Sequence, residues 1–190
     1  MIKSVELSKA YRLLNHGPTV LVSSQHGEKR NVMAAAWNMP LDFEPPKIAI
    51  VIDKNTFTRE LLEASGSFAI NVPCRAQAAM VVKVGSSSGH ELLDKEANNK
   101  FLAFDLPTFS ASKIEAPLLI GCVAWLECKI IKEPHAQDTY DLFMAEVVAA
   151  QADSSVFSDG HWHFEDHDEL RTIHHIAGGN FMAIGEAFKI

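Results

Sequence analysis

Residues 55–59, Asn-Thr-Phe-Thr-Arg, combine the features of an anion-binding site at the start of a helix. The first turn of a helix has backbone N–H groups without partners, and these attract anions. The hydroxyls of Thr56 and Thr58 and the cation of Arg59 would add to that attraction. The same residues also fit a purely structural role, in which Asn55 or Thr56 only caps the helix. From these residues alone both interpretations stay open.

The segment 83–89, Lys-Val-Gly-Ser-Ser-Ser-Gly, is a second candidate for an anion site. A loop of glycine and serine can turn several N–H groups and hydroxyls toward one anion. It can equally be a flexible connection between two elements.

Asn31 lies in a strand-like run next to three small residues, Ala34, Ala35 and Ala36, and Trp37 follows. Small side chains let a flat ligand approach the backbone, and an amide can donate and accept hydrogen bonds at the edge of a heterocycle. Close packing of a strand against a helix explains the alanines equally well.

Histidine is concentrated near the end of the chain, at positions 161, 163, 167, 174 and 175. His161 and His163 would share one face of a strand, but no cysteine or regularly spaced carboxylate completes a metal-binding motif. We therefore predict a solvated polar surface and no metal site. His174 and His175 would point to opposite faces of an extended chain, so at most one of them enters a shared site.

Nucleotide-binding motifs with a defined spacing are absent from the sequence. It contains no Gly-x-Gly-x-x-Gly and no Gly-x-x-x-x-Gly-Lys-Ser/Thr, so neither a dinucleotide-binding fingerprint nor a P-loop is present. A phosphate would have to be held in another way.

Strands dominate the elements that must position these residues. Apolar, β-branched runs predict a hairpin, Pro18–Ser24 with Lys29–Trp37, and single strands at Lys47–Asp53 and Ser67–Val72, while Leu41–Pro46 is extended because each proline restricts the residue before it. Two longer runs, Leu118–Ile131 and Thr139–Ala150, predict a second hairpin, and residues 178–185 predict a turn and a last short strand.

Helices are predicted to be short. One follows Asn55 and stops at Gly66, one covers residues 74–84, and Ser88 with Glu91 has the spacing of a capping box that would open a third. Because helices do not alternate regularly with strands, the fold class is mainly β with short connecting helices, and a closed or nearly closed barrel would remove exposed strand edges. The 190 residues fit a single domain, residues 1–190.

Composition excludes several functions. A net charge of −7 without a dense basic run argues against nucleic-acid binding. Residues 1–14 lack the apolar core of a signal peptide, and no stretch approaches the roughly 18 apolar residues of a membrane span. We therefore predict a cytoplasmic protein without membrane contact, whose three cysteines (Cys74, Cys122, Cys128) are buried, reduced thiols.

The ordered set of motifs resembles the flavin reductase-like, flavoredoxin-type family of FMN-binding split β-barrels. The resemblance rests on Gly17–Ser24, Asn31–Trp37, Glu44–Ile50, Thr56–Thr58 and Phe68–Pro73, and weaker matches continue to the terminal Gly-Gly-Asn-Phe at 178–181. It departs from the family at Ala136–Thr139, where many relatives have Gly-Asp-His.

The resemblance implies a homodimer with one FMN per subunit in a groove at the subunit interface. The flavin ring would lie against the strand that contains Asn31, Met33, Ala34, Ala35, Ala36 and Trp37. Thr56, Thr58 and Arg59 would meet the phosphate, and Ser86 and Ser87 would close over it. A histidine before the last strand lies near the nicotinamide in related reductases, and His175 is the preferred candidate here.

The function implied by this resemblance is hydride transfer from NADH or NADPH to FMN, followed by electron delivery to free flavin, ferric iron or a redox protein partner. The flavin supplies the redox chemistry, and the protein orients it and excludes water. Two alternatives remain: a non-enzymatic FMN-binding electron carrier, and a metal-binding protein that uses the histidine-rich segment.

Overall fold

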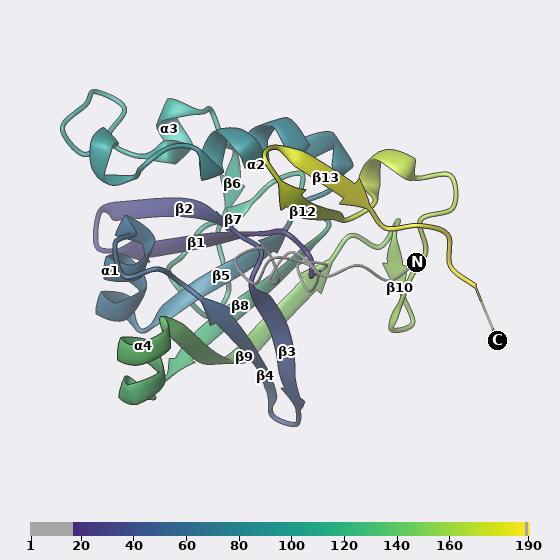
Figure 1. Ribbon diagram of the computed structural model, residues 1–190, viewed down its shortest axis with the longest axis horizontal. Coiled ribbons are helices and arrows are strands. Elements are labelled where there is room, and N and C mark those ends of the chain that lie inside the picture. Colours follow the sequence, from purple (N-terminus) through teal and green to yellow (C-terminus); the bar gives the residue numbers. More distant parts are fainter. Residues whose placement is uncertain (1–16, 189) are drawn as a thin grey trace, which may run out of the picture.

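A seven-stranded antiparallel sheet forms the centre of the structure, a computed structural model that describes residues 17–188 and 190 (Figure 1). The strands follow the order β2-β1-β5-β8-β9-β4-β3, so β2 and β3 stand at the two ends. Their bounds are Val20–His26 (β1), Lys29–Ala35 (β2), Asn38–Phe43 (β3), Pro46–Val51 (β4), Ser67–Val72 (β5), Ala124–Ile131 (β8) and Leu142–Ala152 (β9). The mainly β fold class and the split barrel predicted from the sequence are confirmed.

The first hairpin is the one that the sequence predicts. Strands β1 and β2 pair from Val20 opposite Ala35 to His26 opposite Lys29. Alternate side chains of β1 enter two different cores, because successive residues of a strand point to opposite faces. Val20 and Val22 pack in the barrel core with Phe68 and Phe143, whereas Leu21 packs with residues of helix α2.

Strand β3 was predicted only as an extended segment. It pairs with β4 through a turn at Glu44–Pro45, and its side chains are largely exposed. The prolines at positions 40, 45 and 46 prevented the prediction of a strand here. Proline has no N–H to donate to a neighbouring strand, so it argues against a strand except at a sheet edge or a turn.

Helix α1, Phe57–Ser65, begins and ends as the sequence predicts. The Thr56 hydroxyl accepts the Arg59 N–H as an N-cap, and Gly66 ends the helix in the left-handed conformation with φ 71°. Phe57, Leu61 and Leu62 are buried, which places the apolar face of the helix against the sheet.

The other helices are short and connective. The predicted helix 74–84 is a 3-10 turn at Arg75–Gln77 followed by α2, Ala78–Gly85. The capping box at Ser88 is wrong: the turn His90–Leu92 starts from Gly89 without a side-chain cap. Helix α3, Lys100–Ala103, was not predicted, because a single turn capped by Asn99 is too short to show apolar periodicity.

The second long hairpin is interrupted twice. Leu118–Leu119 forms a separate strand, β7, paired with β6 (Thr108–Phe109), because Gly121 turns the chain with φ 90° before β8 begins. Thr139 and Tyr140 belong to helix α4, Pro134–Tyr140, and not to β9. Proline is favoured in the first turn of a helix, and Pro134 occupies that place here.

Two small hairpins complete the chain: β10 (Phe157–Ser158) with β11 (His161–Trp162), and β12 (Ile173–Ala177) with β13 (Asn180–Ala183). The predicted last strand is β13, and its partner β12 was missed. Figure 1 shows the β12–β13 hairpin beside helix α2. Ile173 and Phe181 of this hairpin join the core around α2.

Several sequence predictions concern smaller features. Cys74, Cys122 and Cys128 are buried free thiols, as predicted. In the described part of the chain no helix is long and apolar enough to cross a membrane. The N-terminal segment judged for a signal peptide, residues 1–14, lies outside the described residues.

Candidate functional site

Two adjoining cavities lie along the end of strand β2. Both are lined by Ala34, Ala35 and Ala36 and by His175 and Gly178. Strand β2 stands at an end of the sheet order, where alternate residues turn backbone N–H and C=O groups away from the neighbouring strand. The small side chains of the three alanines therefore leave room for a ligand, and the backbone of this segment offers hydrogen-bonding groups.

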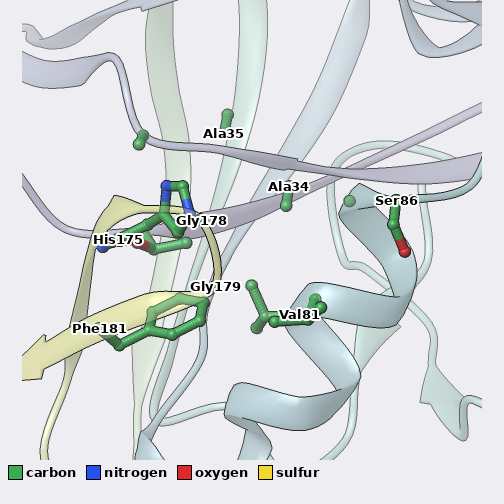
Figure 2. A pocket seen from close by; sticks show the side chains of 12 residues that line it. Ala34, Ala35, Val81, Ser86, His175, Gly178, Gly179 and Phe181 are labelled. Carbon is green, nitrogen blue, oxygen red and sulfur yellow. Dashed lines mark hydrogen bonds between the residues drawn. The ribbon is translucent and has the colours of Figure 1, made fainter.

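The first cavity, of about 380 Å³, lies between β2, helix α2 and the β12–β13 hairpin (Figure 2). Val81 and Phe181 face it with apolar surface, and Ser86 borders its far end. Gly178 and Gly179 turn the hairpin with φ 56° and 77°, a conformation that other residues rarely adopt. The result is a slot with mostly apolar walls, suited to a flat ring.

His175 belongs to β12 and lines both cavities. Its backbone N–H donates to Thr19 Oγ1 over 2.7 Å, and its ring lies 5.2 Å from that of Phe181, centroid to centroid. Of the two adjacent histidines, His175 is the one that lines these cavities, in line with the prediction that at most one enters a shared site.

The second cavity, of about 550 Å³, is more polar. Met33 and Trp37 lie on its β2 side, and Asp53, Tyr140 and Asp141 contribute the polar wall. Trp37 is 55% exposed and lines this cavity rather than the first. Met33 to Trp37 thus line one or both of these cavities.

Asn31 does not line either cavity. Its side chain is buried, and its Nδ2 donates to Thr58 Oγ1 over 3.0 Å. The Oδ1 of Asn31 is buried without a hydrogen-bond partner among the described residues. The amide therefore joins β2 to helix α1, in place of the predicted contact at the edge of a heterocycle.

The start of helix α1 keeps the features of an anion site. Thr56 Oγ1 donates to Asp53 O over 2.8 Å and accepts the Arg59 N–H over 3.3 Å. Thr58 Oγ1 accepts from Asn31, so its hydroxyl proton remains for another acceptor. The remaining N–H groups of the first turn have no partner within the helix.

Arg59 differs from its predicted role as a phosphate ligand. The residue is 6% exposed, and its guanidinium donates to Glu63 over 2.8 Å, to Asp141, and to the backbone oxygens of Ile52 and Gln137. Two carboxylates compensate its charge, and they hold its pKa above the usual value against the opposing effect of burial. Arg59 therefore braces α1 against α4 and β9.

The loop that follows α2 lies against the start of α1. A Cβ atom at Gly89 would stand 2.7 Å from Asn31 Nδ2, so glycine is required for this contact. The next residue, His90, approaches Glu60 at 3.2 Å, and its ring centroid is 5.1 Å from that of Phe57. The structure thus brings the two anion-site candidates of the sequence together.

Ser86 and Ser87 stand at the carboxyl end of α2. Their hydroxyls donate to Lys83 O over 3.4 and 2.9 Å. Gly85–Gly89 also has the spacing Gly-x-Ser-x-Gly of a nucleophile elbow, which requires a strand before the serine and a helix after it. Ser87 follows a helix instead, so the loop is not such an elbow.

The histidine-rich segment forms no metal-binding group. Within residues 17–188 and 190, no three side chains of His, Cys, Asp or Glu gather to hold an ion. His161 Nδ1 donates to Asp159 O over 2.7 Å, and His163 pairs with Ser158 Oγ over 2.9 Å.

Sequence reasoning missed several residues that line the cavities, among them Thr19, Val81, Val82, Asp53 and Tyr140. Thr19 lies in a segment that was predicted only as a strand. Val81 and Val82 lie in a segment that was predicted only as a helix. No local signal marks these residues, because their positions follow from how distant elements pack.

The fold is a split barrel with an apolar slot beside an edge strand and a candidate anion site at a neighbouring helix, features suited to binding a flat, charged ligand. The model for the flavin reductase like domain matches residues 12–170, most of the chain. The chain therefore belongs to the flavin reductase-like family.

Individual relatives agree with this assignment. The uncharacterized protein YddH of Escherichia coli (strain K12) is 44% identical over 185 residues, which cover 96% of this chain and 94% of the relative. Among solved structures, the FMN-binding domain of a flavin reductases-like enzyme from Shewanella baltica OS155 is 52% identical, with a TM-score of 0.85 over 99% of this chain and 96% of that one. Flavoredoxin of Desulfovibrio vulgaris (Miyazaki F), 24% identical with a TM-score of 0.81 over 100% and 97% of the chains, shares the fold.

Proposed function

We propose that this chain binds one FMN per subunit beside strand β2 and works as an NAD(P)H-dependent oxidoreductase. The observation that carries the proposal is the slot along Ala34–Ala36, which lies close to an anion site formed from two loops. The Shewanella baltica relative, which is 52% identical, is an FMN-binding domain.

The residues present fit this cofactor. A flavin needs a thin apolar slot, hydrogen bonds along the edge of its ring system and a site for its phosphate. Alanines and glycines keep the slot thin, and the free edge of β2 supplies backbone N–H and C=O groups. Thr56 and Thr58 at the start of α1 would hold the phosphate, together with Ser86 and Ser87 from the loop that contacts Asn31 through Gly89. The unpartnered Asn31 Oδ1 can accept one further hydrogen bond at this junction.

When bound, FMN would supply hydride and electron transfer. The chain's own residues orient and shelter it: β2 fixes one edge, and Phe181 and Val81 exclude water from the apolar side. We assign His175, which lines both cavities, to the place where the nicotinamide of NADH or NADPH approaches. Electrons would then pass to free flavin, ferric iron or a redox protein partner.

We also propose that two copies of the chain form a homodimer with the cofactor at their interface. An apolar cavity of about 510 Å³ lies next to the proposed site and shares Ala36 and Trp37 with it. Strand β3 beside it leaves Met39, Leu41 and Phe43 exposed by 56%, 43% and 97%. A contiguous exposed apolar surface of this kind marks an interface.

Titration with FMN tests cofactor binding. We expect quenching of FMN fluorescence at one FMN per chain. Val82→Trp should abolish it, because Val82 is exposed on α2 and the larger side chain would fill the first cavity. Leu102→Trp, at an exposed apolar position on α3 that does not line the cavity, is the control and should bind FMN normally. A wild-type protein that does not bind FMN would contradict the proposal.

Light scattering after size-exclusion chromatography tests the dimer. We expect a mass of two chains for the wild type and of one chain for Met39→Glu, with FMN binding weakened in the variant. Leu102→Glu places the same charge on an exposed apolar position away from β3 and should remain dimeric. A wild-type protein that is monomeric and still binds one FMN per chain would refute the proposed site at the subunit interface.

A further inference from the structure

Lys100 is a buried cation that directly follows a polar stretch of the chain, residues 94–99. It is the first residue of α3 and is 3% exposed. Its neighbours Val84 and Phe101 belong to the core around α2. Lysine is almost never fully buried unless its charge is paired, so this position calls for an explanation.

No carboxylate pairs with Lys100 in the described part of the chain. Its Nζ donates instead to the backbone oxygen of Val84 over 2.8 Å. Burial alone lowers the pKa of Lys100 to about 8, with no anion to oppose the effect. A buried ammonium without a counter-ion is costly, and a bound anion would relieve that cost.

Val84 lies in the last turn of α2, where the carbonyl groups form the negative end of the helix dipole. Ser86 and Ser87 follow directly, and their hydroxyls already donate to Lys83 O. A phosphate at these serines would be repelled by the carbonyl end unless a cation neutralises it. Lys83 is exposed and lies over the Phe104 ring at 4.7 Å, so its charge is screened by water, whereas that of Lys100 is not.

We propose that Lys100 is the buried counter-charge of this helix end, which lets the loop Gly85–Ser88 hold a phosphate and makes the site prefer FMN over riboflavin. Lys100 acts through Val84 and the loop, so it is a positioning residue and not a catalytic one. This inference rests on the proposed binding of FMN and adds the residue that distinguishes the phosphorylated flavin from the flavin without phosphate.

The test compares the dissociation constants of FMN and riboflavin by fluorescence quenching. The proteins are the wild type, Lys100→Met, Lys100→Arg and Lys129→Met, and circular dichroism confirms that each is folded. Lys129 is an exposed lysine on β8, so Lys129→Met changes the net charge equally without touching α2.

We expect the wild type and Lys129→Met to bind FMN at least tenfold more tightly than riboflavin. Lys100→Met should lose at least tenfold in FMN affinity and less than twofold in riboflavin affinity, and Lys100→Arg should retain most of the preference. Equal losses for both flavins, or no loss, would overturn the inference and leave Lys100 a packing residue. Should Lys100→Met fail to fold, a wild type that binds the two flavins equally would overturn it as well. A wild type that binds neither flavin refutes the proposed function itself.

Discussion

The Asn31 amide donates a hydrogen bond of 3.0 Å to Thr58 Oγ1, and both side chains are almost fully buried. This contact joins the edge strand of the sheet to the first turn of helix α1. Because Gly89 packs directly on the same amide, one asparagine organises a strand, a helix and a loop around the proposed phosphate site.

We predict that Asn31→Ala lowers the free energy of unfolding by about 1 to 2 kcal/mol, because it removes a buried hydrogen bond and leaves Thr58 without its donor. FMN affinity should fall with it. A double-mutant cycle with Thr58→Val, followed by urea unfolding, should give a coupling energy of about 0.5 to 1.5 kcal/mol. Additive effects of the two substitutions would show that the contact contributes nothing to stability.

Gly89→Ala should destabilise the fold by about 1 to 3 kcal/mol and weaken FMN binding, because the new methyl group must displace Asn31. The backbone at Gly89 has φ −67°, so the effect is steric and not conformational. Gly185→Ala is the control, since nothing lies within 4 Å of a Cβ atom there. Thermal unfolding measures both, and equal melting temperatures for the two variants would refute the account of Gly89.

His175→Phe should slow the reduction of bound FMN by NADH or NADPH by about tenfold or more, within the range of effects that a positioned side chain gives. FMN affinity should change little, because phenylalanine preserves a ring next to Phe181. Anaerobic stopped-flow absorbance measures the rate. His174→Phe, at the adjacent strand position, provides the comparison: if it alone slows the reaction, the role belongs to His174.

Stability should depend on pH through Lys100. Between its lowered pKa of about 8 and the ordinary value of 10.5, the unfolded chain binds more protons than the folded one, so raising the pH stabilises the fold. This contribution amounts to about 1 kcal/mol between pH 7 and 9.

Urea unfolding at both pH values checks this prediction. The stability of the wild type relative to Lys100→Met should rise with pH. The comparison cancels shared contributions, including those of the cations on neighbouring elements, Arg30 and Lys83, and of Cys122 and Cys128, whose pKa values burial raises to about 12. A difference independent of pH would mean that Lys100 titrates normally.

Much of the sheet could be predicted because its strands alternate or run continuously apolar between turn residues, as in Val20–His26 and Ser67–Val72. Strand β3 was not predicted as a strand because prolines interrupt its sequence pattern. Helix α4 was not predicted because Thr139 and Tyr140 favour strands. Pro134 and the tertiary packing favour the helix instead.

The site was predicted less completely than the fold. The sequence marks Thr56, Thr58 and the loop at 85–89 as anion candidates, but not that Gly89 contacts Asn31. The role of Arg59 depends on Asp141, which lies 82 positions later in the chain. Lys100 carries no local signal at all, because only the packing of α3 against α2 buries it.

Anaerobic mixing of the FMN-loaded protein with NADH, and separately with NADPH, tests the central claim most directly. The account predicts that at least one nicotinamide bleaches the flavin absorbance within seconds, and that free flavin or ferric iron then restores it. Bound flavin that stays oxidised with both donors, yet is reduced at once by dithionite, would contradict the reductase and identify a non-enzymatic electron carrier.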